Sequence, residues 1–375
     1  MTDETVCAIA LTCIPKLSGR QALELYKHMG NDATPLFAED KDTLRERLHD
    51  IPSAMFCLLM DGREGAYRRA VEEWEFIQKH NIGCLCYGGE GYPVRLTECD
   101  DAPLVLYYKG NADLNSTYIL SVVGTRSCTE YGKDVCRKVI ADLSRMRPDI
   151  LIVSGLAYGI DIHSHRNALA TGLKTVAVIA HGMDRIYPSV HRDTAKAMLQ
   201  QGGMLTEYMK GTQPERGNFL SRNRIIAGLA DACLVVESAY KGGSLVTARI
   251  AQGYGRDVLA VPGRITDKYS EGCNGLIRHN TAALVTSAED ILHALNWPDE
   301  TEEQSARQPV EQDLFGSCSE EEMAVIQLLQ NDDKQINQLV VESNMPVARV
   351  SAVLFELEMR NIVRLMAGGR YHLIK

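Results

Sequence analysis

A chain of 375 residues is long enough for two or three domains, and its content of 45% apolar and 24% charged residues is ordinary for a globular protein. No run of about 18 apolar residues occurs, which argues against a membrane span, and the acidic start of the chain does not fit a secretory signal. The net charge of −9 argues against a uniformly basic nucleic-acid binder, and eleven scattered cysteines without a CxxC pair favour reduced thiols in the cytoplasm.

Residues 1–110 are predicted to form an N-terminal helical region. Apolar residues at helical spacing, closed by Gly30 as a C-cap, indicate a helix within residues 18–30. A longer amphipathic pattern indicates a second helix over residues 63–83. Turn residues and a short strand, residues 104–108, complete this region.

Residues 111–297 alternate between β-branched runs and helical patterns. The predicted strands are 118–124, 149–155, 174–180, 203–207, 232–237, 257–263 and 282–287. Helices are expected to start near Tyr131, Ile160, His191, Leu220, Ser244 and Gly275. Continuous apolar strands separated by helices indicate a parallel sheet covered on both faces, so the fold class is α/β, a doubly wound domain.

The C-terminal part is predicted to be a linker followed by a small domain. Residues 298–316 are rich in acids, Gln and Pro, which is typical of a linker. Residues 317–375 show three helices and a hairpin turning at Gly368 and Gly369, a pattern that indicates a winged helix. Its candidate recognition helix, 347–360, carries two arginines and two glutamates and is therefore neutral. A neutral helix is poorly suited to the major groove of DNA, so a protein contact or an intramolecular role is favoured over sequence-specific binding of duplex DNA.

The loops after the strands of such a sheet hold its ligands. After the first strand, Gly124, Thr125 and Arg126 replace the GxGxxG fingerprint, which argues against a dinucleotide cofactor. Arg126 instead places a cation beside helix N-terminal amides, a setting suited to phosphate. The alternative is a surface arginine on a turn.

The next two loops favour structural roles. Asp161, His163 and His165 suggest a metal site, but on a helix Asp161 and His165 share a face while His163 points away. We therefore expect Asp161 to brace the helix start and His165 to pack beneath the loops. Asp184 and the pair Tyr187-Pro188 are expected to form a rigid turn that acts as a scaffold.

The stretch 214–237 combines arginines with one aromatic residue. Phe219 is expected to precede the helix in a polar loop, where a base can stack on it, with its packing against its own helix as the alternative. Arg222 and Arg224 diverge by about 200° on a helix, so one is expected to grip a phosphate while the other braces a loop or carboxylate. Arg216 adds a third cation.

Basic charge is concentrated here, since residues 210–280 hold ten Lys/Arg against six Asp/Glu. A second glycine-rich helix start offers further amides and a lysine. No catalytic constellation and no metal site can be assigned to this edge, so a polyanion-binding surface is predicted. Its residues are Gly124, Arg126, Arg216, Phe219, Arg222, Arg224, Lys241, Gly243 and Ser244.

Seven motifs in order make the chain similar to one known family. They include "SVVGTR", "SGLAYGID", "GGMLTEY", "FLSRNRIIAGLA", "GGSLVTA" and "GCNGLI". With these the chain resembles the DNA-processing protein A (DprA/Smf) family, closely over residues 115–297. The N-terminal region is similar in layout to the family's SAM or helix-hairpin-helix region but lacks paired glycines, which argues against DNA contact there.

The resemblance implies a Rossmann-like fold that binds single-stranded DNA without catalysis and without a cofactor. It implies protection of incoming strands in natural transformation and loading of the RecA recombinase, with single-strand-binding protein as a further candidate partner. It assigns the DNA pocket to Arg126, Arg216, Phe219 and Arg222. It also implies a homodimer through the Rossmann-like domain.

Two alternatives compete with this interpretation. The first is a nucleotide hydrolase, because Glu237 at a strand end beside a glycine-rich helix start is an arrangement that such enzymes use to bind phosphates. The competing expectation is that Glu237 forms an ion pair with an arginine such as Arg222 or Arg224. The other alternative is a transcription regulator acting through the winged helix, which the neutral recognition helix argues against.

Overall fold

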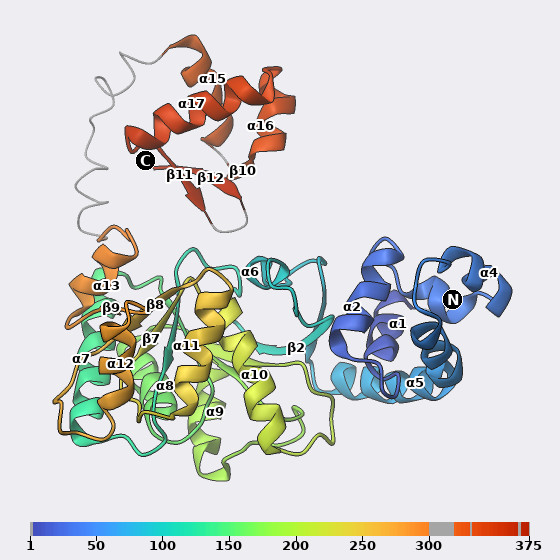
Figure 1. The fold of residues 1–375 in the computed structure, drawn as a ribbon, viewed down its shortest axis with the longest axis horizontal. Helices are drawn as coiled ribbons and strands as arrows, with labels where there is room; N and C mark the ends of the chain where they lie inside the picture. The colour runs from blue at the N-terminus through green and yellow to red at the C-terminus, as the bar shows by residue number, and fades with distance from the viewer. Residues whose placement is uncertain (1–2, 300–318, 331, 367–368, 375) are drawn as a thin grey trace. The chain divides into compact units, whose positions relative to one another are not determined.

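The computed structural model describes residues 3–299, 319–330, 332–366 and 369–374, and the chain forms two compact units, 1–295 and 296–375 (Figure 1). Within the described ranges, no helix is both long enough and apolar enough to cross a membrane. The predicted linker, 298–316, lies outside the described residues from residue 300 onward.

The first unit begins with five helices: α1 (Glu4–Thr12), α2 (Gly19–His28), α3 (Thr34–Ala38), α4 (Lys41–Arg47) and α5 (Ser53–Lys79). Ser18 and Gln21 form a capping box that fixes the start of α2. The long helix α5 starts ten residues before the predicted position because Met55, Phe56 and Leu59 extend its buried face. Helix α1 packs against α5 and is buried along most of its length.

One buried carboxylate connects these helices to the sheet. Glu73 of α5 is only 2% exposed and accepts hydrogen bonds from the backbone N–H of Lys210, at 2.9 Å, and from Arg69, at 2.8 Å. Arg69 also donates to the carbonyl of Lys210, at 2.9 Å. Lys210 lies in the loop that leads into α10 (Arg216–Leu229), so α5 holds this loop in place.

The sheet has the order β1-β2-β6-β5-β4-β3-β7-β8-β9. The seven predicted strands are β3 (Ile119–Val123), β4 (Leu151–Ser154), β5 (Thr175–Val178), β6 (Gly202–Thr206), β7 (Ala232–Val235), β8 (Asp257–Ala260) and β9 (Ala283–Leu284), and their pairings with one another are all parallel. The doubly wound α/β fold class is therefore confirmed. Two strands that precede residue 111 extend the sheet: β2 (Val105–Gly110) pairs antiparallel with β6, and β1 (Gly83–Cys86) pairs antiparallel with β2.

Alternating side chains on the strands face two separate cores. In β5, Val176 and Val178 pack with α10 and α11 (Gly243–Gly253), whereas Ala177 packs with α8 (Ile160–Thr171) and α9 (Arg192–Met198). The remaining elements of this unit are α6 (Val94–Thr97), α7 (Glu130–Met146), η1 (Ser189–His191), α12 (Glu271–Arg278) and α13 (Ala288–Ala294). Helices therefore cover both faces of the sheet.

The strand order reverses at β3, which lies between β4 and β7. The chain first runs outward from β3 through β4, β5 and β6, and then returns to β7 on the other side. In open α/β sheets this reversal opens a crevice at the carboxyl ends of the two strands, where ligands bind.

The second unit is a winged helix, as predicted. It contains α15 (Glu320–Leu329), β10 (Lys334–Gln335), α16 (Ile336–Ser343), α17 (Val347–Met359), β11 (Val363–Met366) and β12 (Arg370–Leu373). The three strands pair in the order β10-β12-β11, and the helices enclose a small apolar core. Gly368, predicted in the turn of the hairpin, lies outside the described residues.

Candidate nucleic-acid interface

A cavity of about 320 Å³ lies at the reversal point of the sheet. The end of β3, the start of α8, the first turns of α10 and the start of α11 surround it. Of the predicted residues, the structure brings six to this cavity: Gly124, Arg126, Phe219, Arg222, Gly243 and Ser244. Arg216, Arg224 and Lys241 are not part of its lining.

Arg126 and Phe219 form the exposed part of the site. The guanidinium carbon of Arg126 lies 5.3 Å from the centre of the Phe219 ring, a cation–π distance. Arg126 is exposed, and none of the hydrogen bonds or ion pairs found among the described residues involves its side chain. Phe219 is half-buried and also contacts the Tyr187 ring, with 5.8 Å between centroids. A cation and an aromatic face are thus presented together.

The start of α10 differs from its prediction. The helix begins at Arg216, not near Leu220, so Phe219 lies inside its first turns and not in a preceding loop. The polar residues 216–218 carry no apolar periodicity and therefore concealed the first turn. The helical placement has a consequence: Phe219 and Arg222 share a face three residues apart, with the Arg222 guanidinium 5.8 Å from the ring centre. Arg216, the first helical residue, is exposed.

Arg222 lies beneath the cavity and is only 3% exposed. Its Nη1 donates hydrogen bonds to the carbonyls of Gly155, at 2.8 Å, and Val178. Burial lowers the pKa of Arg222 to about 10, while the neighbouring Asp161 carboxylate opposes this shift. Arg222 therefore connects α10 to the ends of β4 and β5.

Arg224 does not line the cavity and forms an ion pair with Glu207. The expectation that one of the two arginines is available to grip a phosphate is therefore not met in this structure, because Arg222 is held by carbonyls and Arg224 by a carboxylate. These partners lie 17 to 67 residues away along the chain. Local sequence patterns carry no signal for such pairings.

Backbone amides supply the second polar part of the site. Helix α11 begins after Gly242 without a side-chain cap, and no hydrogen bond involving the amides of Gly243 and Ser244 is found among the described residues. Such amides at the N-terminus of an 11-residue helix bind anions. Gly124 allows α8 to approach the end of β3, because a Cβ at Gly124 would lie 2.4 Å from the Ile160 side chain.

Glu237 is fully engaged at the end of β7. It is buried, and its two carboxylate oxygens accept from the backbone N–H of Thr129, at 2.9 Å, and from the Thr129 hydroxyl, at 2.6 Å. The predicted arginine partner was wrong, since Arg222 and Arg224 are held elsewhere. Glu237 fixes the loop between β3 and α7, and no observation favours the nucleotide-hydrolase alternative.

Asp161 and His165 have the structural roles that were predicted. Asp161 is buried and accepts from the backbone N–H of Ala157 at the start of α8, at 3.4 Å; burial raises the pKa of its carboxyl. His165 Nδ1 lies 2.7 Å from the Thr175 hydroxyl, and burial lowers the pKa of His165 to about 3, so its ring is neutral. Asp161 thus fixes the loop before α8, and His165 fixes α8 against β5.

The fold and crevice define a class: an α/β protein whose doubly wound sheet carries, at its reversal point, a crevice lined by a cation, an aromatic ring and helix N-terminal amides, with a winged helix as a second unit. Residues 83–296 match the family model of DNA recombination-mediator protein A, and residues 302–369 match the DprA winged helix domain. The chain belongs to the DprA/Smf family of DNA processing proteins.

Individual relatives agree with this assignment. The DNA processing protein DprA of Streptococcus pneumoniae is 44% identical over 201 residues, which cover 54% of this chain and 70% of that protein. Its X-ray structure superposes with a TM-score of 0.66 at 33% identity, covering 78% of this chain and 98% of that one. DNA processing protein A from Helicobacter pylori, solved for its single-stranded DNA binding mode, gives a TM-score of 0.51 at 28% identity and covers 57% and 95% of the two chains.

Proposed function

We propose that this protein is a non-catalytic single-stranded DNA-binding protein of DNA processing and natural transformation, which protects single strands and loads the RecA recombinase onto them. The observation that carries the proposal is the contact of Arg126 with Phe219 beside the N-terminal amides of α11, where neither the guanidinium nor the amides have a hydrogen-bond partner in the described part of the chain. The single-stranded DNA binding mode described for the Helicobacter pylori relative supports it. We place the protein in the cytoplasm, where these partners act.

The chemistry of the crevice matches a single strand. An aromatic face accepts any base, while Arg126 and the amides of Gly243 and Ser244 are suited to phosphates. Arg216 and Lys241, which lie outside the crevice lining, are suited to phosphates of a strand that leaves it. A base that inserts against Phe219 exchanges the contact with Arg126 or Tyr187 for its own stacking contact. Phosphate contacts carry no base information, so binding is largely independent of sequence.

The proposal is tested by fluorescence anisotropy with a thymine oligonucleotide and a matched duplex, at two salt concentrations. Tight and salt-sensitive binding to the single strand, with weak duplex binding, supports the proposal. Preference for the duplex, or no binding, contradicts it. RecA-dependent strand exchange on DNA coated with single-strand-binding protein then measures whether the protein accelerates loading.

Replacing Arg126 by alanine is expected to reduce the salt slope of single-strand binding by about 0.7, the share of one phosphate contact. The reason is that Arg126 is exposed and makes no competing ion pair in the described part of the chain. The slope is measured as log affinity against log salt concentration. Arg137 is a matched control, since its guanidinium is exposed but paired with Asp134; a slope unchanged in both variants removes Arg126 from the phosphate contacts.

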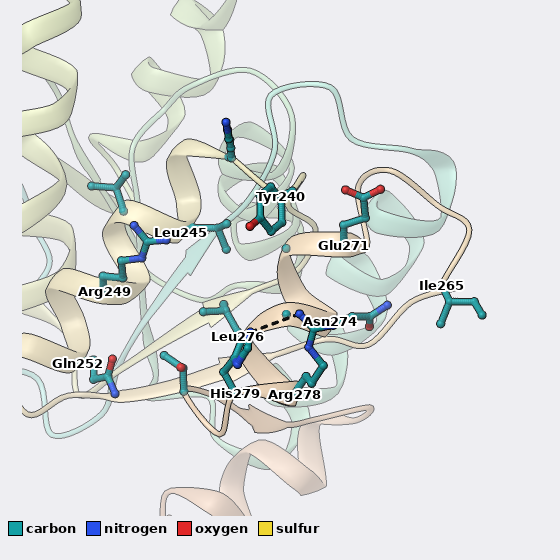
Figure 2. A pocket seen from close by; sticks show the side chains of 16 residues that line it. Tyr240, Leu245, Arg249, Gln252, Ile265, Glu271, Asn274, Leu276, Arg278 and His279 are labelled. Carbon is teal, nitrogen blue, oxygen red and sulfur yellow. Dashed lines mark hydrogen bonds between the residues drawn. The ribbon is translucent and has the colours of Figure 1, made fainter.

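We also propose a homodimer through the Rossmann-like unit. A cavity of about 1160 Å³ lies between α11 and α12, and Figure 2 shows Tyr240, Arg249, Arg278 and His279 around it. Beside it, β9 is the last strand of the sheet and leaves Leu284 half exposed. Exposed edge strands pair readily with another chain.

Leu284→Glu is therefore expected to shift the protein from dimer to monomer, because the charge opposes burial of the β9 edge. Sedimentation velocity over a range of protein concentrations measures this shift. Val190→Glu, at an exposed apolar residue of η1 between β5 and α9, is the matched control. A dimer that persists in Leu284→Glu places the interface elsewhere.

The winged helix is suited to a protein contact. Its Arg349 and Arg360 pair with Glu321 and Glu322, while Phe355 and Met359 on α17 remain exposed. Both arginines of the candidate recognition helix are thus paired with carboxylates of the same unit. We assign this unit to contact with protein and not to duplex recognition.

A further inference from the structure

Two more aromatic residues lie exposed at the edge of the sheet that carries the crevice. Tyr158 follows β4 and Tyr187 follows β5, and they remain 49% and 45% exposed. Strands β4 and β5 are neighbours, so both tyrosines emerge at adjacent strand ends. Tyr187 contacts Phe219, as described above, and the ring of Tyr158 lies edge-on to the His191 ring, with 5.1 Å between centroids. Neither tyrosine fills a core.

Buried histidines hold both tyrosines in place. His191 Nδ1 donates to the carbonyl of Leu156, at 2.8 Å, which fixes the ring that Tyr158 contacts. His181 Nδ1 donates to the carbonyl of Gly182, at 2.9 Å, and its Nε2 accepts from the backbone N–H of Tyr187, at 3.2 Å. Burial lowers the pKa of His181, which keeps the ring neutral and Nε2 free to accept.

The Tyr158 loop packs directly on the backbone of the arginine that stacks on Phe219. Gly159 has a φ of +77°, and a Cβ there would lie 2.1 Å from the carbonyl oxygen of Thr125 and 2.7 Å from that of Arg126. The backbone N–H of Ile160 donates to the same Thr125 oxygen, at 3.2 Å. Tyr158 is therefore held next to the Arg126 loop, at the rim of the crevice.

An exposed arginine follows the histidine whose ring Tyr158 contacts. Arg192 directly follows His191, is exposed, and takes part in none of the side-chain hydrogen bonds or ion pairs found within the described ranges. Arg185, which precedes Tyr187 by two residues, differs because it is paired with Asp184. The exposed ring of Tyr158 is thus one residue contact away from an exposed arginine, and an aromatic ring together with a cation is the combination that single-stranded nucleic acid uses.

We propose that Tyr158 and Arg192 form a second aromatic–cation pair, which extends the single-strand-binding surface from Phe219 past Tyr187 and across the ends of β4 and β5. The inference rests on the proposed function, since its ligand is the same single strand. A base stacks on Tyr158 and a phosphate contacts Arg192. Because this pair lies outside the crevice that contains Phe219, only a strand long enough to leave the crevice reaches it.

The test compares oligothymidylates of rising length, from about four to about 16 nucleotides, by fluorescence anisotropy. Wild-type affinity is expected to rise with length as the strand reaches Tyr158. Tyr158→Ala and Arg192→Ala are expected to bind the shortest oligonucleotide like wild type and the longest about five-fold or more weakly. Tyr158→Phe is expected to keep the gain and Tyr158→Leu to lose it, since leucine retains apolar surface without an aromatic face.

The possible outcomes separate this inference from the proposed function. Absence of single-strand binding by the wild-type protein overturns both. If the wild-type protein binds and the variants gain affinity with oligonucleotide length as it does, the second aromatic–cation pair is overturned while the proposed function stands. Arg192→Ala provides an independent measurement if Tyr158→Ala does not fold, and Arg20→Ala, an exposed arginine in the N-terminal helices, is its matched control. An equal loss at every length in Arg192→Ala also contradicts the inference, since the pair would then act on the crevice itself.

Discussion

Phe219→Ala is expected to weaken binding of single-stranded DNA by about 1–3 kcal/mol, or about five- to 150-fold, while the fold is retained. The ring is half-buried and belongs to none of the apolar clusters found among the described residues; it contacts Arg126, Arg222 and Tyr187. Its loss therefore removes the stacking face more than it removes packing. Anisotropy with a thymine oligonucleotide measures the affinity, and urea unfolding measures the stability.

The aromatic face can be separated from other effects of this substitution. Phe219→Tyr retains the ring and is expected to bind within about two-fold of wild type. Phe355→Ala removes an exposed phenylalanine from the winged helix and serves as the control for nonspecific loss of an aromatic side chain. An unchanged affinity of Phe219→Ala would remove stacking from the proposed mechanism.

Arg222→Ala is expected to reduce the free energy of unfolding by about 3–5 kcal/mol, the cost of removing one partner from a buried charged network. The carbonyls of Gly155 and Val178 lose their donor, and the buried carboxyl of Asp161 loses the positive charge that lowers its pKa. Urea unfolding of the variant at neutral pH measures the effect. A variant as stable as wild type would contradict the role of Arg222 as a structural connection.

The cause of that loss can be checked through Asp161. Its pKa in the folded state is raised already, and without Arg222 it rises further, so the folded variant binds a proton that the unfolded chain has released. The stability of Arg222→Ala is therefore expected to fall as pH rises through the range between the unfolded and folded pKa values. Adding Asp161→Asn should remove this pH dependence and restore part of the stability. If the double variant keeps the same dependence, another group is responsible.

The parallel part of the sheet was predictable because its strands are buried on both faces. Val176, Ala177 and Val178 form a continuous apolar run, and such runs separated by helices specify a doubly wound fold. Strands β1 and β2 were not assigned to the sheet, since they join it antiparallel without the helix that marks a parallel crossover.

The site was predictable in its residue types more than in its contacts. Arg126, Phe219 and the start of α11 were identified as candidates because cations, an aromatic residue and glycines follow strand ends in the sequence. The partners of Arg222, Arg224 and Glu237 were not predictable, because they are selected by burial and by distance in the folded chain. The contact between Tyr187 and Phe219 joins residues 32 positions apart, and the Tyr187-Pro188 turn gave no local sign of it.

The contact of Glu73 with Lys210 has a consequence for how the protein can be divided. A fragment restricted to residues 83–296, the range of the family model, would keep every residue of the crevice but lose α5. The backbone N–H of Lys210 and the loop before α10 would then lose the carboxylate that holds them. The N-terminal helices thus hold the loop that leads into α10, and a fragment meant to retain the proposed single-strand-binding site is expected to need a start upstream of Arg69 and Glu73.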